Sequence, residues 1–164
     1  MFEKKPFKKH LDKQAILIKL RYYCAYQERC HSEVRSKLLD LGCYGEDHDQ
    51  IIADLIAENF LNEERFAQMF AQGKFNIKYW GRIRIRLELK SKKVSDYSIK
   101  KAINQFDEAD YFKGLLAFLD KKDKLLNEPD AYARRQKLFG YAQAKGFEVE
   151  LILKALKERV HGES

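Results

Sequence analysis

Apolar residues recur along the chain at helical spacing, three or four positions apart. Residues 12–29 show the pattern clearly, with Ile16, Leu20 and Tyr23 on one predicted helix face. Residues 81–90, GRIRIRLELK, differ because cations alternate with aliphatic residues, a pattern that on its own is typical of a half-buried β-strand. The chain has only two prolines and eight glycines in 164 residues. This scarcity of turn residues favours helices over a many-stranded fold.

An internal repeat decides the structure of residues 81–90. The segment 33–44 aligns with 84–95 at an offset of 51 residues, and 84–95 aligns with 137–148 at an offset of 53. The aligned apolar columns are Val34, Ile85 and Leu138; Leu38, Leu89 and Ala142; and Cys43, Val94 and Phe147. The outer copies end at Gly42 and Gly146, as helices with a glycine C-cap do. Residues 81–90 are therefore predicted to be helical.

The repeat extends beyond these segments and defines three units. After these segments, the middle and last copies align without a gap: Ile99, Ala102 and Ile103 match Ile152, Ala155 and Leu156. The first copy aligns after about four inserted residues, with Ile52, Leu55 and Ile56. We predict an all-α fold of three tandem three-helix repeats. Repeat 1, with a basic N-terminal tail, spans residues 1–60, repeat 2 spans 61–106 and repeat 3 spans 107–164.

Several residues mark predicted helix starts. Asn62 and Ser95 are suitable N-cap residues, and Pro129 suits the first position of a helix. The predicted helices span residues 12–29, 31–41, 46–58, 62 onward, 80–92, 95–106, a segment around 112–119, 129 onward and 148–159.

The predicted helix at residues 80–92 has two apolar faces. At 100° per residue, Ile83 and Leu87 fall on one side and Ile85 and Leu89 on another, which predicts packing between neighbours. The remaining side forms a predicted exposed cationic stripe of Arg82, Arg86, Lys90 and Lys93.

Positive charge is concentrated around this helix. Residues 78–101 hold nine Lys or Arg against two acids, a net charge of +7 that equals the charge of the whole chain. Such a field favours an anionic partner, either nucleic acid or an acidic protein groove, although a solvated helix face would also explain it. The candidate binding residues are Lys78, Arg82, Arg86, Lys90, Lys92, Lys93, Lys100 and Lys101.

The residues indicate neither catalysis nor a cofactor. Cys24, Cys30 and Cys43 lack the C-x2-C spacing of a zinc site, and an odd number of cysteines fits a reducing compartment. Cys30 and His31 diverge by about 100° on a helix, so they do not form a thiol–base pair. No Gly-rich phosphate loop or H-E-x-x-H motif occurs. We expect a protein that is not an enzyme and binds no metal or cofactor.

Five aromatic residues have two interpretations. They could stack on single-stranded bases, but their helical spacing beside aliphatic residues favours packing in the core. They are Tyr22, Tyr23, Tyr26, Tyr79 and Trp80.

The chain has no predicted membrane segment. Its longest aliphatic run, residues 15–18, is far shorter than the roughly 20 residues that span a bilayer, and its N-terminus lacks an apolar signal core. We expect a cytoplasmic monomer.

The order of motifs resembles the RecX family of regulators of the recombinase RecA. The similarity runs from about Leu17 to Leu156 and is clearest in NFLNEERFAQMF, residues 59–70. It includes YCAYQERCHSEVRSKLLDLG at 23–42, the segment with Gly81, Ile85, Glu88 and Leu89, and AKGFEVELILKAL at 144–156. The chain departs from the family where Cys30 replaces an N-cap serine. It also departs at Lys92-Lys93, which replaces Lys-Gly and predicts a lysine in a left-handed conformation.

The resemblance implies an elongated, curved array that binds the RecA–DNA filament and inhibits its extension, ATP hydrolysis and strand exchange, with weak binding to single- or double-stranded DNA. A second hypothesis is a sequence-independent nucleic-acid binder that acts on DNA directly. A third is a general helical-repeat scaffold, although the repeats of such proteins are usually shorter than the offsets found here.

Overall fold

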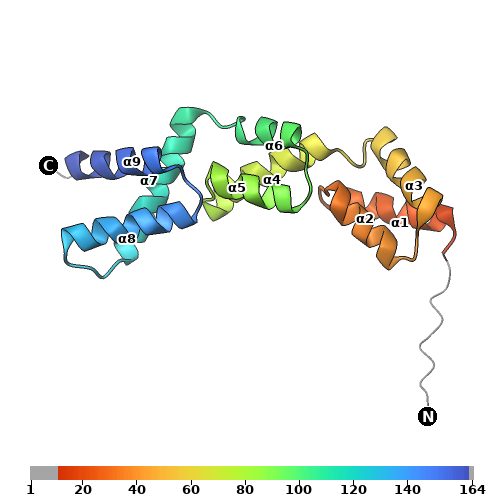
Figure 1. Ribbon diagram of the computed structural model, residues 1–164, viewed down its shortest axis with the longest axis horizontal. Coiled ribbons are helices and arrows are strands. Elements are labelled where there is room, and N and C mark those ends of the chain that lie inside the picture. The colour runs from red at the N-terminus through yellow and green to blue at the C-terminus, as the bar shows by residue number, and fades with distance from the viewer. Residues whose placement is uncertain (1–10, 163–164) are drawn as a thin grey trace, which may run out of the picture. The chain divides into compact units, whose positions relative to one another are not determined.

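The computed structural model describes residues 11–162 and is all-α over that range (Figure 1). Its nine helices are α1 Lys13–Tyr26, α2 His31–Asp40, α3 Gly45–Ala57, α4 Glu63–Lys78, α5 Arg82–Ser91, α6 Asp96–Ile103, α7 Glu108–Leu125, α8 Ala131–Ala144 and α9 Val149–Gly162. The prediction of an all-α fold is confirmed, and residues 82–90 are helical rather than a strand, with Gly81 as the N-cap. The basic tail that we predicted for repeat 1 lies outside the described residues.

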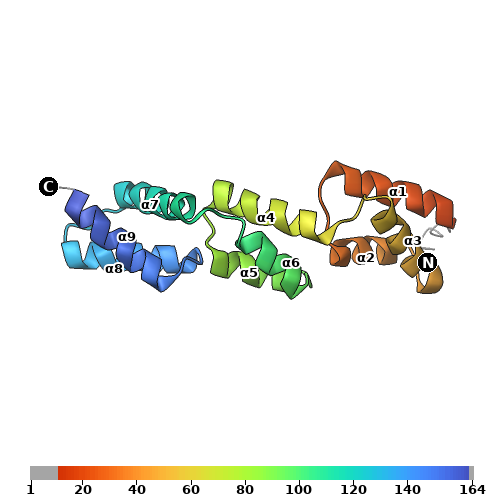
Figure 2. The ribbon, with the colours of Figure 1, turned by 90° about the horizontal axis from the view of Figure 1, so that it is seen from above.

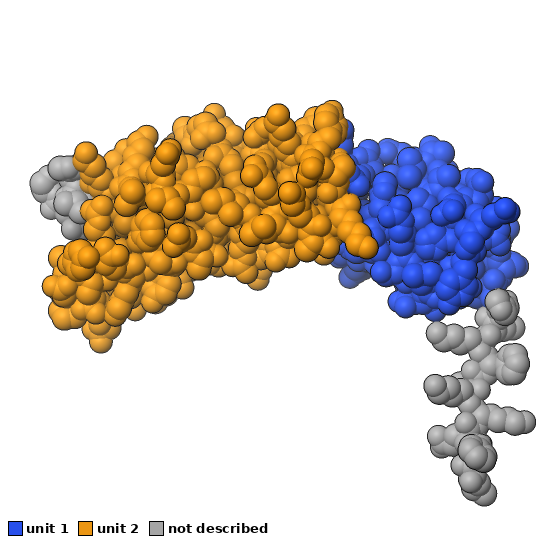
Figure 3. All heavy atoms as spheres, in the orientation of Figure 1, with its two compact units in different colours: residues 1–66 blue, residues 67–164 orange. Residues whose placement is uncertain are grey.

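The helices group in threes. Helices α1, α2 and α3 contact one another, α5 contacts α6, and α7, α8 and α9 contact one another. Within each group the second and third helices lie on one side of the first (Figure 2). We propose that each group is one repeat with the limits predicted above. The chain also divides into two compact units, residues 1–66 and 67–164, so all of repeat 2 after residue 66 shares a unit with repeat 3 (Figure 3).

The second helix of every repeat ends in the same way. The residue after its C-cap has a positive φ in each case: 76° at Gly42, 61° at Lys93 and 92° at Gly146. The amide of the following residue then donates to the carbonyl five residues earlier, at 2.9, 3.1 and 3.2 Å, from Cys43, Val94 and Phe147 respectively. This is the bond that closes a Schellman motif. The prediction that a lysine occupies the left-handed position of repeat 2 is confirmed.

The aligned columns are also the core. All nine side chains of the three apolar columns are 6% exposed or less. The alignment of the third helix in repeat 1 is wrong at one position, because Ile56 is 46% exposed whereas Ile51 is fully buried. The insertion of about four residues that we predicted before this helix is also wrong, because the connection has four residues in every repeat: 41–44, 92–95 and 145–148. Without the insertion, the buried Ile51 and Ile52 align with Ala102 and Ile103.

Polar caps begin most of these helices. The Asn62 side chain accepts a bond from the Arg65 amide at 2.9 Å, which confirms Asn62 as an N-cap. Ser95 is confirmed as well, since its hydroxyl accepts from the Ser98 amide at 3.3 Å. Pro129, however, is not the first residue of a helix.

The second helix of repeat 3 starts two residues after that proline. The N-cap of α8 is Asp130, whose carboxylate accepts a bond from the Ala133 amide at 2.8 Å. The Asp130 carboxylate thus gives the Ala133 amide, in the first turn, the hydrogen-bond acceptor that it lacks within the helix. Helix α8 therefore starts after Asp130 rather than at Pro129.

The N-cap of α2 is weakened, as predicted. Cys30 occupies this position without a side-chain cap bond. Its thiol instead donates to the Glu33 carboxylate, with an Sγ to Oε1 distance of 3.2 Å. Because the thiol is a poor acceptor, the reciprocal pair of bonds that a serine makes here is missing.

Repeats 2 and 3 meet through their backbones at the start of α5. The Gly81 amide donates to the Lys145 carbonyl at 2.8 Å, and the Ile83 amide donates to the Gly146 carbonyl at 3.0 Å. A Cβ on Gly81 would lie 2.3 Å from the Gly146 oxygen, and a Cβ on Gly146 would lie 2.4 Å from the Arg84 Cβ. Only glycine allows this approach, which fixes α5 against the end of α8.

Candidate functional site

Helix α5 is buried on one side only. Ile85 and Leu89 are fully buried, whereas Ile83 is 45% and Leu87 is 62% exposed. The prediction that α5 packs on two apolar faces is wrong, because no helix in the described part of the chain covers the side of Ile83 and Leu87. An exposed aliphatic surface therefore lies beside the cations of this helix.

Three predicted cations share this exposed surface. Arg86, Lys90 and Lys93 are all exposed. Among residues 11–162, Lys90 has one carboxylate nearby, with its Nζ 3.9 Å from Asp96 Oδ1, and both side chains are more than half exposed. Such a pair contributes little and leaves the lysine available to a partner. We define the α5 face as Ile83, Arg86, Leu87, Lys90 and Lys93.

Arg82 does not belong to this surface. Its side chain is only 16% exposed, with Nη1 3.1 Å from Glu148 Oε2 and Nη2 2.7 Å from Glu108 Oε1. Its guanidinium carbon lies 3.8 Å from the centre of the Tyr111 ring. The prediction that Arg82 is part of the exposed stripe is wrong, since the first turn of α5 faces repeat 3 and its acids.

Tyr111 completes the contact around Arg82. Its hydroxyl donates to Glu148 Oε1 at 2.6 Å and accepts from the Arg82 amide at 3.0 Å. Burial, followed by the bond to Glu148, raises the pKa of Tyr111 far above its ordinary value, so the hydroxyl stays protonated as a donor. Arg82 is thus held as a bridge between repeats 2 and 3.

Two other candidate cations lie at the ends of α4 and α5. Lys78 is exposed, and its carbonyl accepts a bond from Lys145 Nζ at 3.0 Å. Lys92 is half-buried, with its Nζ 5.9 Å from the centre of the Phe70 ring.

Lys100 and Lys101 form a separate group on α6. They line a shallow pocket of about 620 Å³ together with Gln68, Tyr97, Asn104 and Gln105. Both lysines are exposed, and Lys101 Nζ lies 5.9 Å from the centre of the Tyr97 ring. The eight candidate residues therefore occupy several surfaces and not one stripe.

Tyr79 and Trp80 are packed, as the core interpretation predicts. The Trp80 ring lies 6.3 Å from the Phe70 ring, edge to face, and the Arg84 guanidinium lies 4.3 Å from its centre. The Tyr79 ring lies 5.9 Å from the ring of Phe118. These contacts occupy the rings, which leaves little aromatic surface for bases.

The same interpretation is wrong for two residues of α1. Tyr22 is 76% and Tyr26 is 84% exposed. Tyr23 between them is half-buried and packs beneath the Arg29 guanidinium at 3.8 Å. The helical phase relative to the buried Ile16 and Leu20 separates these cases, because only Tyr23 shares their face and Tyr22 and Tyr26 lie on another side of α1.

The thiols lie in inert surroundings. Cys24, Cys30 and Cys43 are buried and unpaired, and burial raises the pKa of Cys24 to about 11. Burial also raises the pKa of Cys30, whose thiol contacts Ser32 and Glu33. A nucleophilic cysteine needs the opposite shift. Over the described range, no group of three or more His, Cys, Asp or Glu side chains is placed to hold a metal ion.

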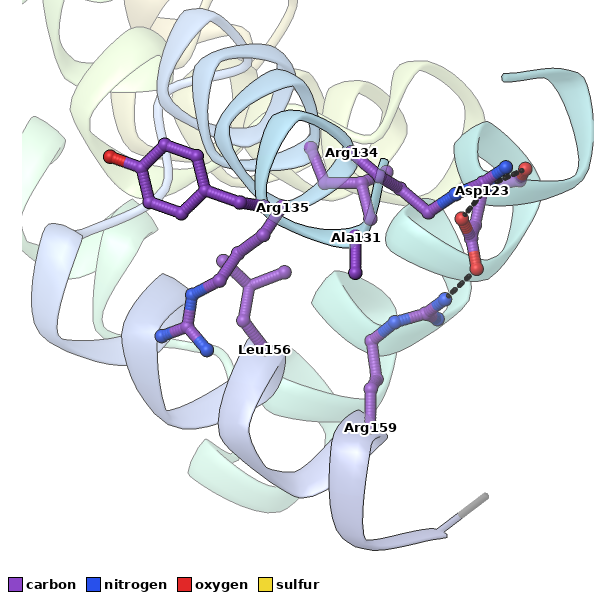
Figure 4. A pocket seen from close by; sticks show the side chains of 8 residues that line it. Asp123, Ala131, Arg134, Arg135, Leu156 and Arg159 are labelled. Atoms are coloured by element: carbon purple, nitrogen blue, oxygen red, sulfur yellow. Dashed lines mark hydrogen bonds and ion pairs between the residues drawn. The ribbon is translucent and has the colours of Figure 1, made fainter. Parts of the chain in front are cut away.

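A pocket of about 330 Å³ in repeat 3 is not an anion site (Figure 4). Arg134 and Arg159 both point toward Asp123, with Arg159 Nη2 2.6 Å from Asp123 Oδ2, while Arg135 points away from them. Because Arg134 and Arg159 are already neutralised by Asp123, these pairs stabilise the contact of α7 with α8 and α9. Arg135 and Tyr132 line the outer part of the pocket.

Comparison with known proteins identifies the relatives of this chain. Residues 62–103 match the second three-helix domain of RecX, and residues 108–156 match the third, so the two matches together cover more than half of the sequence. The chain belongs to the RecX family. Within the described residues, no helix has the length and apolar content needed to cross a membrane.

Similar RecX proteins come from several bacteria. Regulatory protein RecX of Prosthecochloris aestuarii is 29% identical over 83% of this chain and 87% of its own length. The RecX of Clostridium botulinum is 30% identical over 82% of this chain, and that of Clostridium perfringens is 27% identical over 74%. The matched segment spans 64% and 58% of these two clostridial relatives, less than two thirds of either.

Solved RecX structures have the same fold. The crystal structure of RecX from Lactobacillus salivarius superposes with a TM-score of 0.81, covering 89% of this chain and 95% of that one at 20% identity. A second crystal structure of regulatory protein RecX gives 0.78, covering 89% and 71% at 21% identity. The all-α repeat fold is therefore common to this chain and to these two RecX proteins.

Proposed function

We propose that this protein is a non-catalytic regulator that binds the RecA–DNA filament through the α5 face. Binding there would hinder filament extension, ATP hydrolysis and strand exchange. Membership of the RecX family supports RecA as the partner. The observation that carries the choice of surface is the combination of exposed aliphatic and cationic side chains on one side of α5.

The aliphatic part of this surface favours a protein partner over DNA alone. Leu87 is 62% exposed between the cations Arg86 and Lys90. Phosphate contacts require only cations, whereas protein interfaces bury apolar side chains at their centre and surround them with polar groups. A filament that presents acidic and apolar groups next to DNA would satisfy both kinds of side chain.

The distribution of charge in repeat 2 supports the same surface. Arg82 is neutralised by Glu108 and Glu148, so it adds little to the outward field. Arg86 and Lys93 have no ion-pair partner within residues 11–162, and their charge is left to attract an anionic partner.

Charge reversal on the α5 face tests this proposal. Filaments of RecA are assembled on single-stranded DNA with a non-hydrolysable ATP analogue, and the co-sedimenting fraction of added protein is measured. The variant Arg86→Glu/Lys90→Glu should lose at least tenfold in affinity, because each reversal replaces an attraction by a repulsion. The matched control is Lys113→Glu/Lys157→Glu, which makes the same change in net charge at two exposed lysines of α7 and α9.

A second variant separates the filament from DNA alone as the target. Leu87→Ser should weaken binding at both low and high salt, because it removes an apolar contact that salt does not screen. If both α5 variants bind filaments as the wild type does, while the control behaves in the same way, the interface lies elsewhere and the proposal is wrong.

A further inference from the structure

The first repeat exposes two tyrosines for which packing gives no reason. Tyr22 and Tyr26 are 76% and 84% exposed on α1, and within the described part of the chain neither ring contacts another ring or a cation. Residues four apart lie on the same side of a helix, and their positions are separated by about 6 Å along its axis. Two free aromatic faces therefore follow one another along α1.

Cations surround these rings. A cavity of about 410 Å³, which we call the tyrosine groove, is lined by Lys19, Tyr22, Tyr23, Tyr26, Arg29, Lys37 and Leu41. Three of its seven lining residues are aromatic and three are cationic. The groove is formed by α1, α2 and the segment between them, so it belongs entirely to repeat 1.

The charge of the groove is largely uncompensated. Arg29 contributes little to this charge, because its side chain is 14% exposed, stacks on Tyr23 and has Glu33 Oε2 3.9 Å from its Nη1. Lys19 and Lys37 have no ion-pair partner among residues 11–162; Lys37 Nζ instead lies 5.7 Å from the centre of the Tyr23 ring. The surface thus combines exposed rings with a positive field.

We infer that the tyrosine groove binds single-stranded nucleic acid. Bases stack on Tyr22 and Tyr26, and Lys19 and Lys37 neutralise the adjacent phosphates. Stacking platforms beside a positive groove are the usual means of binding single strands without sequence preference. A duplex would not suffice, because its bases are already stacked and paired. An acidic peptide would use the cations but leave the two ring faces without a partner.

This inference does not depend on the proposed function, because the groove lies in repeat 1 and the α5 face lies in repeat 2. The two are tested apart by omitting RecA. A fluorescently labelled 20-nucleotide thymidine strand is titrated with the full-length protein at 50 mM salt, and its anisotropy is followed.

Alanine and phenylalanine variants test stacking. Tyr22→Ala and Tyr26→Ala should each weaken binding about fivefold or more, since base–aromatic stacking contributes about 1–3 kcal/mol. Tyr22→Phe should bind as the wild type does, because the ring is kept. Tyr132→Ala removes a tyrosine of similar exposure, 72%, from α8 and should have no effect.

Two further measurements separate stacking from phosphate attraction. An abasic strand of the same length should bind wild-type protein and the alanine variants equally weakly. Lys19→Gln/Lys37→Gln should reduce the slope of log affinity against log salt by about 1.4, the effect of two phosphate contacts to a single strand.

The inference is overturned if the wild-type protein does not bind the thymidine strand, or if Tyr22→Ala and Tyr26→Ala bind it unchanged. It is also overturned if the abasic strand binds the wild-type protein as tightly as the thymidine strand does. Should Arg86→Glu/Lys90→Glu lose DNA binding while the tyrosine variants keep it, the single strand binds at the α5 face instead.

Discussion

Arg82 and Arg86 are one helical turn apart in the sequence, yet the structure gives them different roles. Arg82 bridges repeats 2 and 3, whereas Arg86 faces solvent. Replacing Arg82 by alanine removes a guanidinium contact with Tyr111 at 3.8 Å and a partly buried pair with Glu148 at 3.1 Å. The expected result is a less stable second unit with an unchanged α5 face.

The size of this loss follows from the contacts. The cation–π contact is worth about 0.5–1 kcal/mol. The bond to Glu148 contributes about 1–1.5 kcal/mol, at or below the lower end for a charged pair, because Glu148 is 31% exposed. The pair with Glu108 adds little, since that side chain is 77% exposed. Arg82→Ala should therefore lower the free energy of unfolding by about 2 kcal/mol.

Denaturant unfolding followed by tryptophan fluorescence measures this change. Trp80 is the single tryptophan of the chain and lies in residues 67–164, so its signal reports on the unit that contains Arg82. The control, Arg86→Ala, should stay within about 0.5 kcal/mol of the wild type because its side chain is exposed. If the two alanine variants are equally stable, the bridging role of Arg82 is refuted.

Two further predictions concern helix ends. Lys93→Gly should raise the free energy of unfolding by about 1 kcal/mol, because φ is 61° there and glycine has no Cβ to strain. Its control, Lys92→Gly, changes a residue at φ −85° and should lower the free energy of unfolding by a similar amount. If thermal unfolding gives both changes the same sign, the assigned conformation is contradicted. The Cys30→Ser variant should be about 1 kcal/mol more stable than Cys30→Ala, as measured by denaturant unfolding followed by circular dichroism. The reason is that a serine hydroxyl can accept a hydrogen bond from an α2 amide, whereas the Cys30 thiol makes no cap bond. Equal stabilities of the two variants would contradict the weakened cap.

The core and the C-terminal end of the second helix in each repeat were predictable because they depend on local patterns. The repeat alignment matched Gly42, Lys93 and Gly146, and each has the positive φ that a helix C-terminus of this type requires. Buried columns follow from the same alignment, since equivalent positions of a repeated unit meet equivalent neighbours.

The surface was less predictable because it depends on what lies across from each residue. Arg82 and Arg86 have the same helical phase within 40°, but only Arg82 meets Glu148, which is 66 residues away in the sequence. Tyr22 and Tyr23 are adjacent, yet only Tyr23 lies under Arg29. A helical pattern gives the direction of a side chain along its own helix and does not identify the element opposite it.

The most direct test of the proposed function is the ATPase activity of RecA on single-stranded DNA, measured with increasing amounts of this protein below the RecA concentration. A filament regulator should inhibit hydrolysis at substoichiometric ratios, and Arg86→Glu/Lys90→Glu should need at least tenfold more protein for the same inhibition. Hydrolysis that stays unchanged across the whole range of wild-type protein would contradict the proposal.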